Sequence, residues 1–221
     1  MEEHPVKLFR FEYSCYARKV QMVLDLLGAR YDVVDVPYGD RTELAELTGG
    51  YIQVPVLVDD TGRVLTDSRD ICRNLLARDD FGWLAPAPWQ GPVWAYADWA
   101  DGALEDVLFR LASPALRIQF AHAADRALFT FVKERKFGAG CIEQWQRDHA
   151  SLLARARELL APTRATLSSR RFLFGDTPTL ADAALYGQLA MLYRAQPRLP
   201  ESLGDEFPRL MADLEGWRRA S

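Results

Sequence analysis

At 221 residues, the chain is long enough to form one large domain or two small ones with a sizeable core. Its content of 49% hydrophobic and 26% charged residues is ordinary for a soluble globular protein. The formal net charge of -4 leaves no basic excess for phosphates, which argues against nucleic acid as the main partner.

No apolar run approaches the length that a membrane-spanning helix needs. The acidic start of the chain, which leads straight into a strand pattern, does not resemble a signal peptide. Three widely spaced cysteines form neither a disulfide framework nor a zinc spacing, and three scattered histidines do not indicate a metal site. We therefore expect a cytoplasmic protein without a structural metal and without a membrane partner.

The first eighty residues alternate between strand and helix patterns. An apolar stripe with helical spacing follows Ser14, a good N-cap, and ends before Gly28, a good C-terminal stop. The expected elements are, in order, a strand over 6–11, a helix over 15–27, a strand over 31–36, a helix over 42–47, a hairpin with strands 56–58 and 63–65, and a helix over 69–77. This order predicts a small mixed sheet covered by helices.

Residues 79–92 break this pattern with repeated proline and glycine, as a linker does. Everything after them shows helical apolar stripes, with a break at residues 138–140. We therefore predict an α/β domain over residues 1–78, a linker over 79–92 and an all-helical domain over 93–221.

Two short motifs indicate a binding site in the α/β domain. Pro55 abuts a strand, which leaves the backbone of Val54 outside the sheet and available to a peptide-like ligand. Asp67 and Ser68 open a helix, and the free N–H groups there suit a ligand carboxylate. Together these motifs suggest a small anionic peptide, for which glutathione is the obvious candidate.

The pattern resembles the cytosolic glutathione transferase superfamily over essentially the whole chain. Four local matches in the family's order carry the resemblance: the turn and helix start at 14–20, Val54-Pro55, Asp67-Ser68 with Ile71, and the segment 174–182. In the last of these, Thr179 and Asp182 predict a capping box with a purely structural role. The resemblance implies a thioredoxin-like domain followed by a helical bundle, glutathione as co-substrate, and a homodimer.

The resemblance assigns the chemistry to the turn before the first helix. Ser14 occupies the position that matches the family's nucleophile-activating residue, where a hydroxyl and a helix N-terminus would both stabilise the glutathione thiolate. Cys15 occupies the position at which proline commonly follows in the cysteine-containing branches. At the first helical position its pKa could fall, but the alternative, a small half-buried apolar residue, is favoured. Tyr13 is a third hydroxyl in reach.

The resemblance also assigns the binding residues. The backbone of Val54, before Pro55, would meet the cysteinyl segment of glutathione, Gln53 matches a glutamine of some members, and Asp67 and Ser68 would hold the γ-glutamyl end. Capping of the helix by Asp67, with Asp70 as box partner, can hold at the same time. Two further groups are candidates: Arg41 for the glycyl carboxylate, and the aromatic residues Trp94, Tyr96, Trp99 and Phe109 for the second, apolar substrate.

Three functions are open at this point. The first is conjugation of glutathione to a small hydrophobic electrophile, with Ser14 stabilising the thiolate. The second is a glutathione-dependent thiol reductase that uses Cys15 covalently. The third is a binding or interaction module without enzymatic activity, because a fold does not determine a function.

Overall fold

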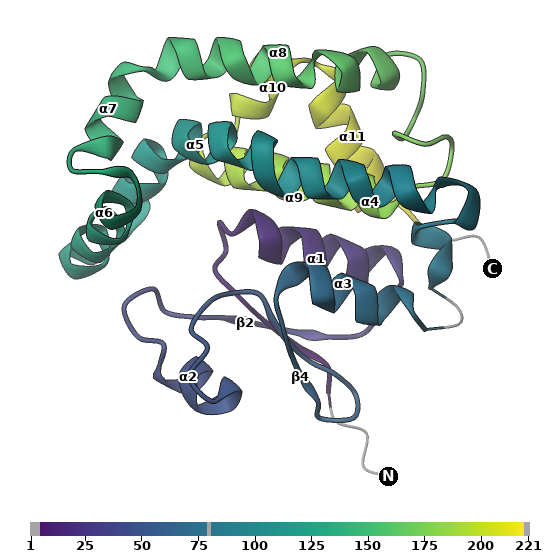
Figure 1. The fold of residues 1–221 in the computed structure, drawn as a ribbon, viewed down its shortest axis with the longest axis horizontal. Coiled ribbons are helices and arrows are strands. Elements are labelled where there is room, and N and C mark those ends of the chain that lie inside the picture. Colours follow the sequence, from purple (N-terminus) through teal and green to yellow (C-terminus); the bar gives the residue numbers. More distant parts are fainter. Residues whose placement is uncertain (1–4, 79–80, 219–221) are drawn as a thin grey trace.

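The computed structural model describes residues 5–78 and 81–218, and it shows a small α/β layer beneath a larger layer of helices (Figure 1). The elements of the first layer are β1 (Lys7–Arg10), α1 (Cys15–Leu26), β2 (Asp32–Asp35), α2 (Thr42–Thr48), β3 (Val56–Val58), β4 (Val64–Thr66) and α3 (Ser68–Leu76). This order agrees with the predicted one, and each bound lies within one residue of its prediction.

The four strands form one mixed sheet in the order β2-β1-β3-β4. β1 runs parallel to β2 and antiparallel to β3, and β4 is antiparallel to β3. Leu8 and Leu57 face each other across the β1–β3 pair and pack into the core shared with α1 and α3, whereas Phe9 and Val56 pack with Leu44 of α2 on the other face. The predicted thioredoxin-like arrangement is confirmed.

The ends of α1 follow from its flanking residues. Ser14 has an extended backbone, and its Oγ accepts a hydrogen bond from the Ala17 N–H at 3.3 Å, as an N-cap does. Gly28 follows the helix with φ +66°, a conformation that glycine adopts without steric cost. Ser14 therefore begins the helix and Gly28 ends it, as predicted.

The second layer consists of helices. In chain order they are the 3₁₀ turns Gly82–Leu84 and Ala87–Trp89, α4 (Gln90–Trp99), a π-helical turn Ala100–Leu104, α5 (Glu105–Gln119), α6 (Ala123–Phe137), α7 (Cys141–Arg147), α8 (His149–Leu167), α9 (Leu180–Ala195), α10 (Leu199–Leu203) and α11 (Glu206–Glu215). The expected linker, 79–92, thus contains two short turns, and α4 begins two residues before the expected end of that linker. Residues 79–80 lie outside the described part.

The two layers share one apolar core, because α9 lies under α5 and packs most extensively against α1 (Figure 1). At Gly187 of α9, a Cβ would overlap the Cys15 carbonyl oxygen and lie 2.9 Å from the Lys19 backbone nitrogen. The absence of a side chain at this position therefore lets the two helices approach closely.

The predicted capping box at the start of α9 is present. The fully buried Asp182 carboxylate accepts from the Thr179 N–H and hydroxyl, each at 2.8 Å, and from the Leu173 N–H at 2.8 Å. Burial raises the pKa of this carboxyl to about 6. The segment before α9 is thereby tied to the helix that supports the first layer.

Within residues 5–78 and 81–218, no helix is both long enough and apolar enough to cross a membrane.

Candidate functional site

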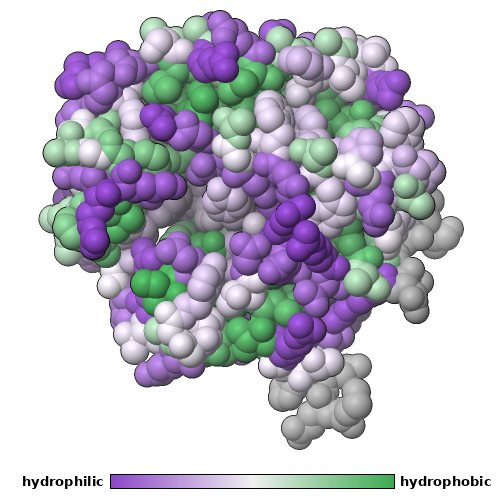
Figure 2. All heavy atoms as spheres, viewed as in Figure 1, coloured by the Kyte–Doolittle hydropathy of each residue, from purple (hydrophilic) through white to green (hydrophobic). Residues whose placement is uncertain are grey.

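A pocket of about 410 Å³ lies between the two layers. Its wall includes all five predicted binding residues: Gln53, Val54, Pro55, Asp67 and Ser68. Figure 2 shows the corresponding face of the molecule, with a hollow left of centre between the α/β layer and the helices above it. The structure therefore brings together two motifs that lie more than ten residues apart in the chain.

The start of α3 forms one side of the pocket. Asp67 has φ +65°, a conformation that is uncommon for residues other than glycine, and its Oδ1 accepts from the N–H groups of Arg69 at 2.8 Å and Asp70 at 3.2 Å. The Asp70 carboxylate pairs with Arg73 at 3.2 Å instead of closing the predicted box. Because Asp67 takes the next two N–H groups, the Ser68 N–H remains for a ligand.

A buried cation connects this helix start to the helical layer. Lys19 of α1 has 2% exposure, and its Nζ donates to Ser68 Oγ at 2.9 Å and to Asp101 Oδ2 of the π-helical turn. Burial alone would lower the pKa of Lys19, but the neighbouring Cys72 and Asp101 raise it, so the lysine stays charged. Since Ser68 Oγ accepts from Lys19, its own O–H is left to donate.

Two polar atoms of the pocket wall are buried without a hydrogen-bond partner among the described residues. They are the acceptor Asp101 Oδ1 and the donor Arg69 Nε. The Arg69 guanidinium meets Asp98 Oδ2, also on the wall, at 2.7 Å through its Nη2. Buried polar atoms without a partner are costly, and a ligand with both an acidic and a basic group would satisfy these two.

The opposite side of the pocket is the backbone before β3. The peptide bond between Val54 and Pro55 is cis, and the ladder with β1 begins only at Val56. The backbone of Val54 therefore lies outside the sheet, beside the pocket.

Ser14 and Cys15 do not line this pocket, although the next residue, Tyr16, does. Ser14 has 8% exposure and Cys15 has 3%. Burial raises the pKa of the Cys15 thiol well above its usual value, which opposes the predicted drop at a helix N-terminus. The Tyr16 hydroxyl donates to the Asp101 carbonyl oxygen at 3.0 Å and joins the turn to the helical layer.

Other predicted candidates have structural roles. Arg41 donates to the carbonyl oxygens of Tyr38 and Ile52, at 3.2 and 3.1 Å, and is not on the pocket wall. Of the predicted aromatic set, the Tyr96 hydroxyl is hydrogen-bonded to the Thr163 hydroxyl at 2.9 Å, and the Tyr96 ring packs at a tilt against that of Trp99. Trp94 lies beneath Arg69 and Arg73. Phe109 alone of the four packs against a separate apolar cluster between the layers, which contains Phe11, Tyr38, Phe129 and Trp145.

Sequence reasoning missed Lys19, Arg69, Asp98 and Asp101. Arg69 follows the predicted Asp67-Ser68 helix start, but nothing in the sequence ties it to acidic residues some thirty positions later. The spacing of Asp98 and Asp101 on one helical stretch, beside a predicted domain boundary, is the signal that could have identified this side of the pocket.

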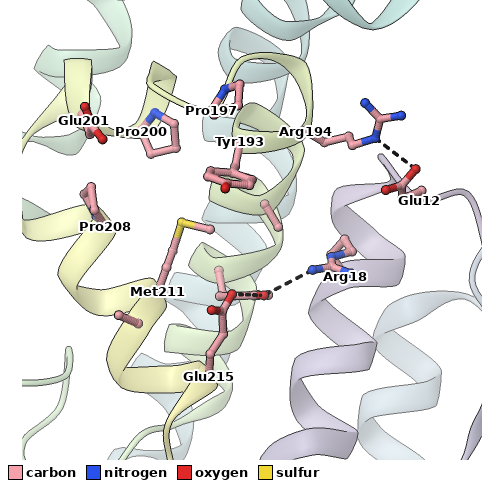
Figure 3. Close-up of a pocket in the computed structure, with 13 residues that line it drawn as sticks. Glu12, Arg18, Tyr193, Arg194, Pro197, Pro200, Glu201, Pro208, Met211 and Glu215 are labelled. Carbon is pink, nitrogen blue, oxygen red and sulfur yellow. Dashed lines mark hydrogen bonds and ion pairs between the residues drawn. The ribbon is translucent and has the colours of Figure 1, made fainter. Parts of the chain in front are cut away.

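A second cavity, of about 380 Å³, lies between α1, α9 and α11 (Figure 3). Four of its charged groups have partners within the protein: Arg194 pairs with Glu12 at 3.0 Å, and Arg18 donates to the Tyr186 hydroxyl at 3.2 Å, which itself donates to Glu215 at 2.8 Å. It contains none of the predicted site residues. Elsewhere in the described residues, no cluster of His, Cys, Asp and Glu could hold a metal ion.

Family models match both parts of the chain. A model of the glutathione S-transferase N-terminal domain matches residues 8–82, and one of the glutathione S-transferase C-terminal domain matches residues 156–212. Together they span more than half of the chain. No curated protein matches it.

Solved structures share the fold. A glutathione S-transferase of Ceriporiopsis subvermispora in complex with glutathione has a TM-score of 0.82 at 18% identity, with 99% of both chains covered. A second one from the same organism, also in complex with glutathione, has a TM-score of 0.79 at 21% identity, with 97% of this chain and all of the other covered. A glutathione S-transferase of Rhodospirillum rubrum has a TM-score of 0.68 at 22% identity, with 95% of this chain and 86% of the other covered.

With the predicted thioredoxin-like and helical layers in place and both family models matched in order, the chain belongs to the glutathione S-transferase superfamily.

Proposed function

We propose that the protein is a glutathione transferase that binds reduced glutathione in the 410 Å³ pocket and conjugates it to an apolar electrophile. One observation carries the proposal. An unpaired buried donor and an unpaired buried acceptor line the same pocket as Val54, whose backbone lies outside the sheet. The γ-glutamyl end of glutathione is a zwitterion, and the rest of the molecule is a peptide, so it matches both features.

The pose follows from the polar groups. The α-carboxylate meets the Ser68 N–H and hydroxyl and Arg69 Nε, at a helix N-terminus that favours an anion. The α-ammonium meets Asp67 and Asp101 Oδ1. The cysteinyl segment pairs with the Val54 backbone in the manner of an added strand. The sulfur then points toward the turn that precedes α1.

The chemistry is activation of the thiol and its placement beside the electrophile. Ser14 Oγ accepts from Ala17, which leaves its O–H to donate to the sulfur, and the N-terminus of α1 adds a partial positive charge. Both effects lower the pKa of the bound thiol. The thiolate electron pair then forms the bond to carbon, and the leaving group departs with its own pair.

The test is a comparison of Ser14→Ala with Cys15→Ala. Loss of the Ser14 hydroxyl should lower kcat/KM by about 100-fold with little change in glutathione affinity, because the donor acts on the thiolate alone. The pKa of bound glutathione, followed by the ultraviolet absorbance of the thiolate, should rise in Ser14→Ala. Unchanged turnover and thiol pKa in that variant would refute the role of Ser14.

A second candidate is a glutathione-binding module without transferase activity. The observation that favours it is the absence of Ser14 and Cys15 from the pocket wall. Tight glutathione binding by calorimetry, combined with no turnover of any electrophile, would identify it. The third candidate, a reductase that uses Cys15, requires a glutathione adduct on Cys15 after treatment with glutathione disulfide; the raised pKa of the buried thiol opposes it.

We also propose a homodimer in the cytoplasm, on the strength of the family. Light scattering coupled to gel filtration tests the dimer, and fractionation of the source cells tests the location. A monomeric mass at micromolar concentration would refute the dimer.

A further inference from the structure

Helix α6 carries a lysine that rests on aromatic rings and forms no salt bridge among the described residues. Lys133 of α6 is partly buried, and its Nζ lies 4.5 Å from the centroid of the Phe109 ring and 5.0 Å from that of Phe129. Among the described residues, it forms no salt bridge and no hydrogen bond. An ammonium that lies on aromatic faces and forms no direct ion pair can bind an anion.

The position of Lys133 relative to the pocket follows from α5. Asp101, which lines the pocket, is followed at four-residue intervals by Glu105 and by Phe109, the ring beneath Lys133. Residues four apart lie on the same side of a helix. Eight residues of helix span about 12 Å, so Phe109, the residue beneath the lysine, lies about that far along the helix from Asp101.

α6 closes this side of the space between the layers. In Figure 1 it descends from α5 toward the α/β layer, on the side of α2. Its first turn touches the loop before α2, where a Cβ on Gly39 would lie 2.6 Å from Asp125 Oδ1. Farther along, the Phe129 ring meets the Tyr13 ring edge-on, with centroids 6.1 Å apart. Tyr13 immediately precedes Ser14, so this wall adjoins the turn that carries the proposed thiol activator.

The charged groups around Lys133 come from three elements. They are Glu105 of α5, Lys136 of α6 and Arg41 of the loop before α2, and the Cys141 thiol also lies nearby. Burial lowers the pKa of Lys133 to about 8, and burial raises that of Glu105 to about 7. Near neutral pH, Lys133 is thus largely charged while Glu105 is partly neutral. The net local charge is positive.

We propose that the second substrate is an aromatic electrophile that carries an anionic group, such as a carboxylate, and that Lys133 binds this group while Phe109 and Tyr13 contact the ring. This inference rests on the proposed function, because it assigns the electrophile side of the same site. An aromatic ring of the substrate suits these aromatic side chains, and a carboxylate supplies the direct ion pair that Lys133 does not form within the protein.

The experiment separates binding from turnover. Affinities for nitrobenzoate and for nitrobenzene, neither of which reacts, are measured by tryptophan fluorescence with saturating S-methylglutathione. Rates with chlorodinitrobenzoate and chlorodinitrobenzene and glutathione are measured in parallel. Lys133→Met removes the cation, Lys133→Arg retains it, and Arg135→Met is the matched control, because Arg135 is an exposed cation on the same helix that lies over the exposed Phe131.

The wild type should bind nitrobenzoate at least about tenfold more tightly than nitrobenzene, as a charge-assisted hydrogen bond implies. Lys133→Met should abolish this preference, while Lys133→Arg and Arg135→Met should keep it. Equal affinities in the wild type, or a preference that survives in Lys133→Met, would overturn the proposal. Absence of turnover with both chlorinated substrates, despite the expected preference in binding, would refute the transferase function and leave the anion site standing.

Discussion

The buried contact between Lys19 and Asp101 offers a quantitative test of how the site is held together. Lys19→Met would leave the Asp101 carboxylate without its cation in a place where Oδ1 already has no partner. Removing one member of a buried ion pair typically costs about 3–5 kcal/mol, because the remaining charge is left without compensation. We expect a loss of about 4 kcal/mol in the free energy of unfolding.

The double variant Lys19→Met with Asp101→Asn removes both charges and should recover much of that loss. The coupling free energy from the double-mutant cycle should be about 3 kcal/mol. A matched cycle on the exposed pair of Arg78 and Asp60, at 2.9 Å, should give less than about 1 kcal/mol. Guanidinium unfolding, followed by far-ultraviolet circular dichroism, measures both cycles. Additive effects at Lys19 and Asp101 would show that the two charges do not support each other.

Three further outcomes are expected. Gly187→Ala should destabilise the protein by about 2 kcal/mol and weaken glutathione binding by calorimetry, because the new methyl group would push against the Cys15 carbonyl oxygen. Asp182→Ala should cost about 3 kcal/mol in chemical unfolding, since two buried N–H groups lose their acceptor. Nitrobenzoate affinity should rise as pH falls from 8.5 toward 6.5. Over this range Lys133, with a pKa of about 8, gains its proton, and Glu105, with a pKa of about 7, becomes neutral. The Glu105→Gln variant should therefore show a smaller rise.

The secondary structure could be predicted because it depends on local signals. The stripe after Ser14, the stop at Gly28 and the capping box before α9 each act within a few residues, and each appears where expected. The two binding motifs could also be predicted, since a proline before a strand and an Asp-Ser helix start have local meaning. Their meeting in one pocket follows from the short connection between them.

The remaining site residues depend on contacts that the sequence does not show. Lys19 carries a charge, yet it is buried because its partner Asp101 lies 82 residues away. Cys15 occupies a helix start that should favour a thiolate, but the approach of α9 buries it and raises its pKa instead. Helical spacing also could not separate Phe109, which joins the cluster between the layers, from Tyr96, which packs against α8.

The close approach at Gly187 has a consequence for how such a protein can change over time. The turn that carries Ser14 rests on a helix from the far end of the chain, so the α/β half is incomplete without its own helical half. A chimera that joins residues 5–78 to the helices of a distant relative should therefore lose the site even if both halves come from working proteins. The two halves of the chain that form this pocket are therefore expected to evolve together.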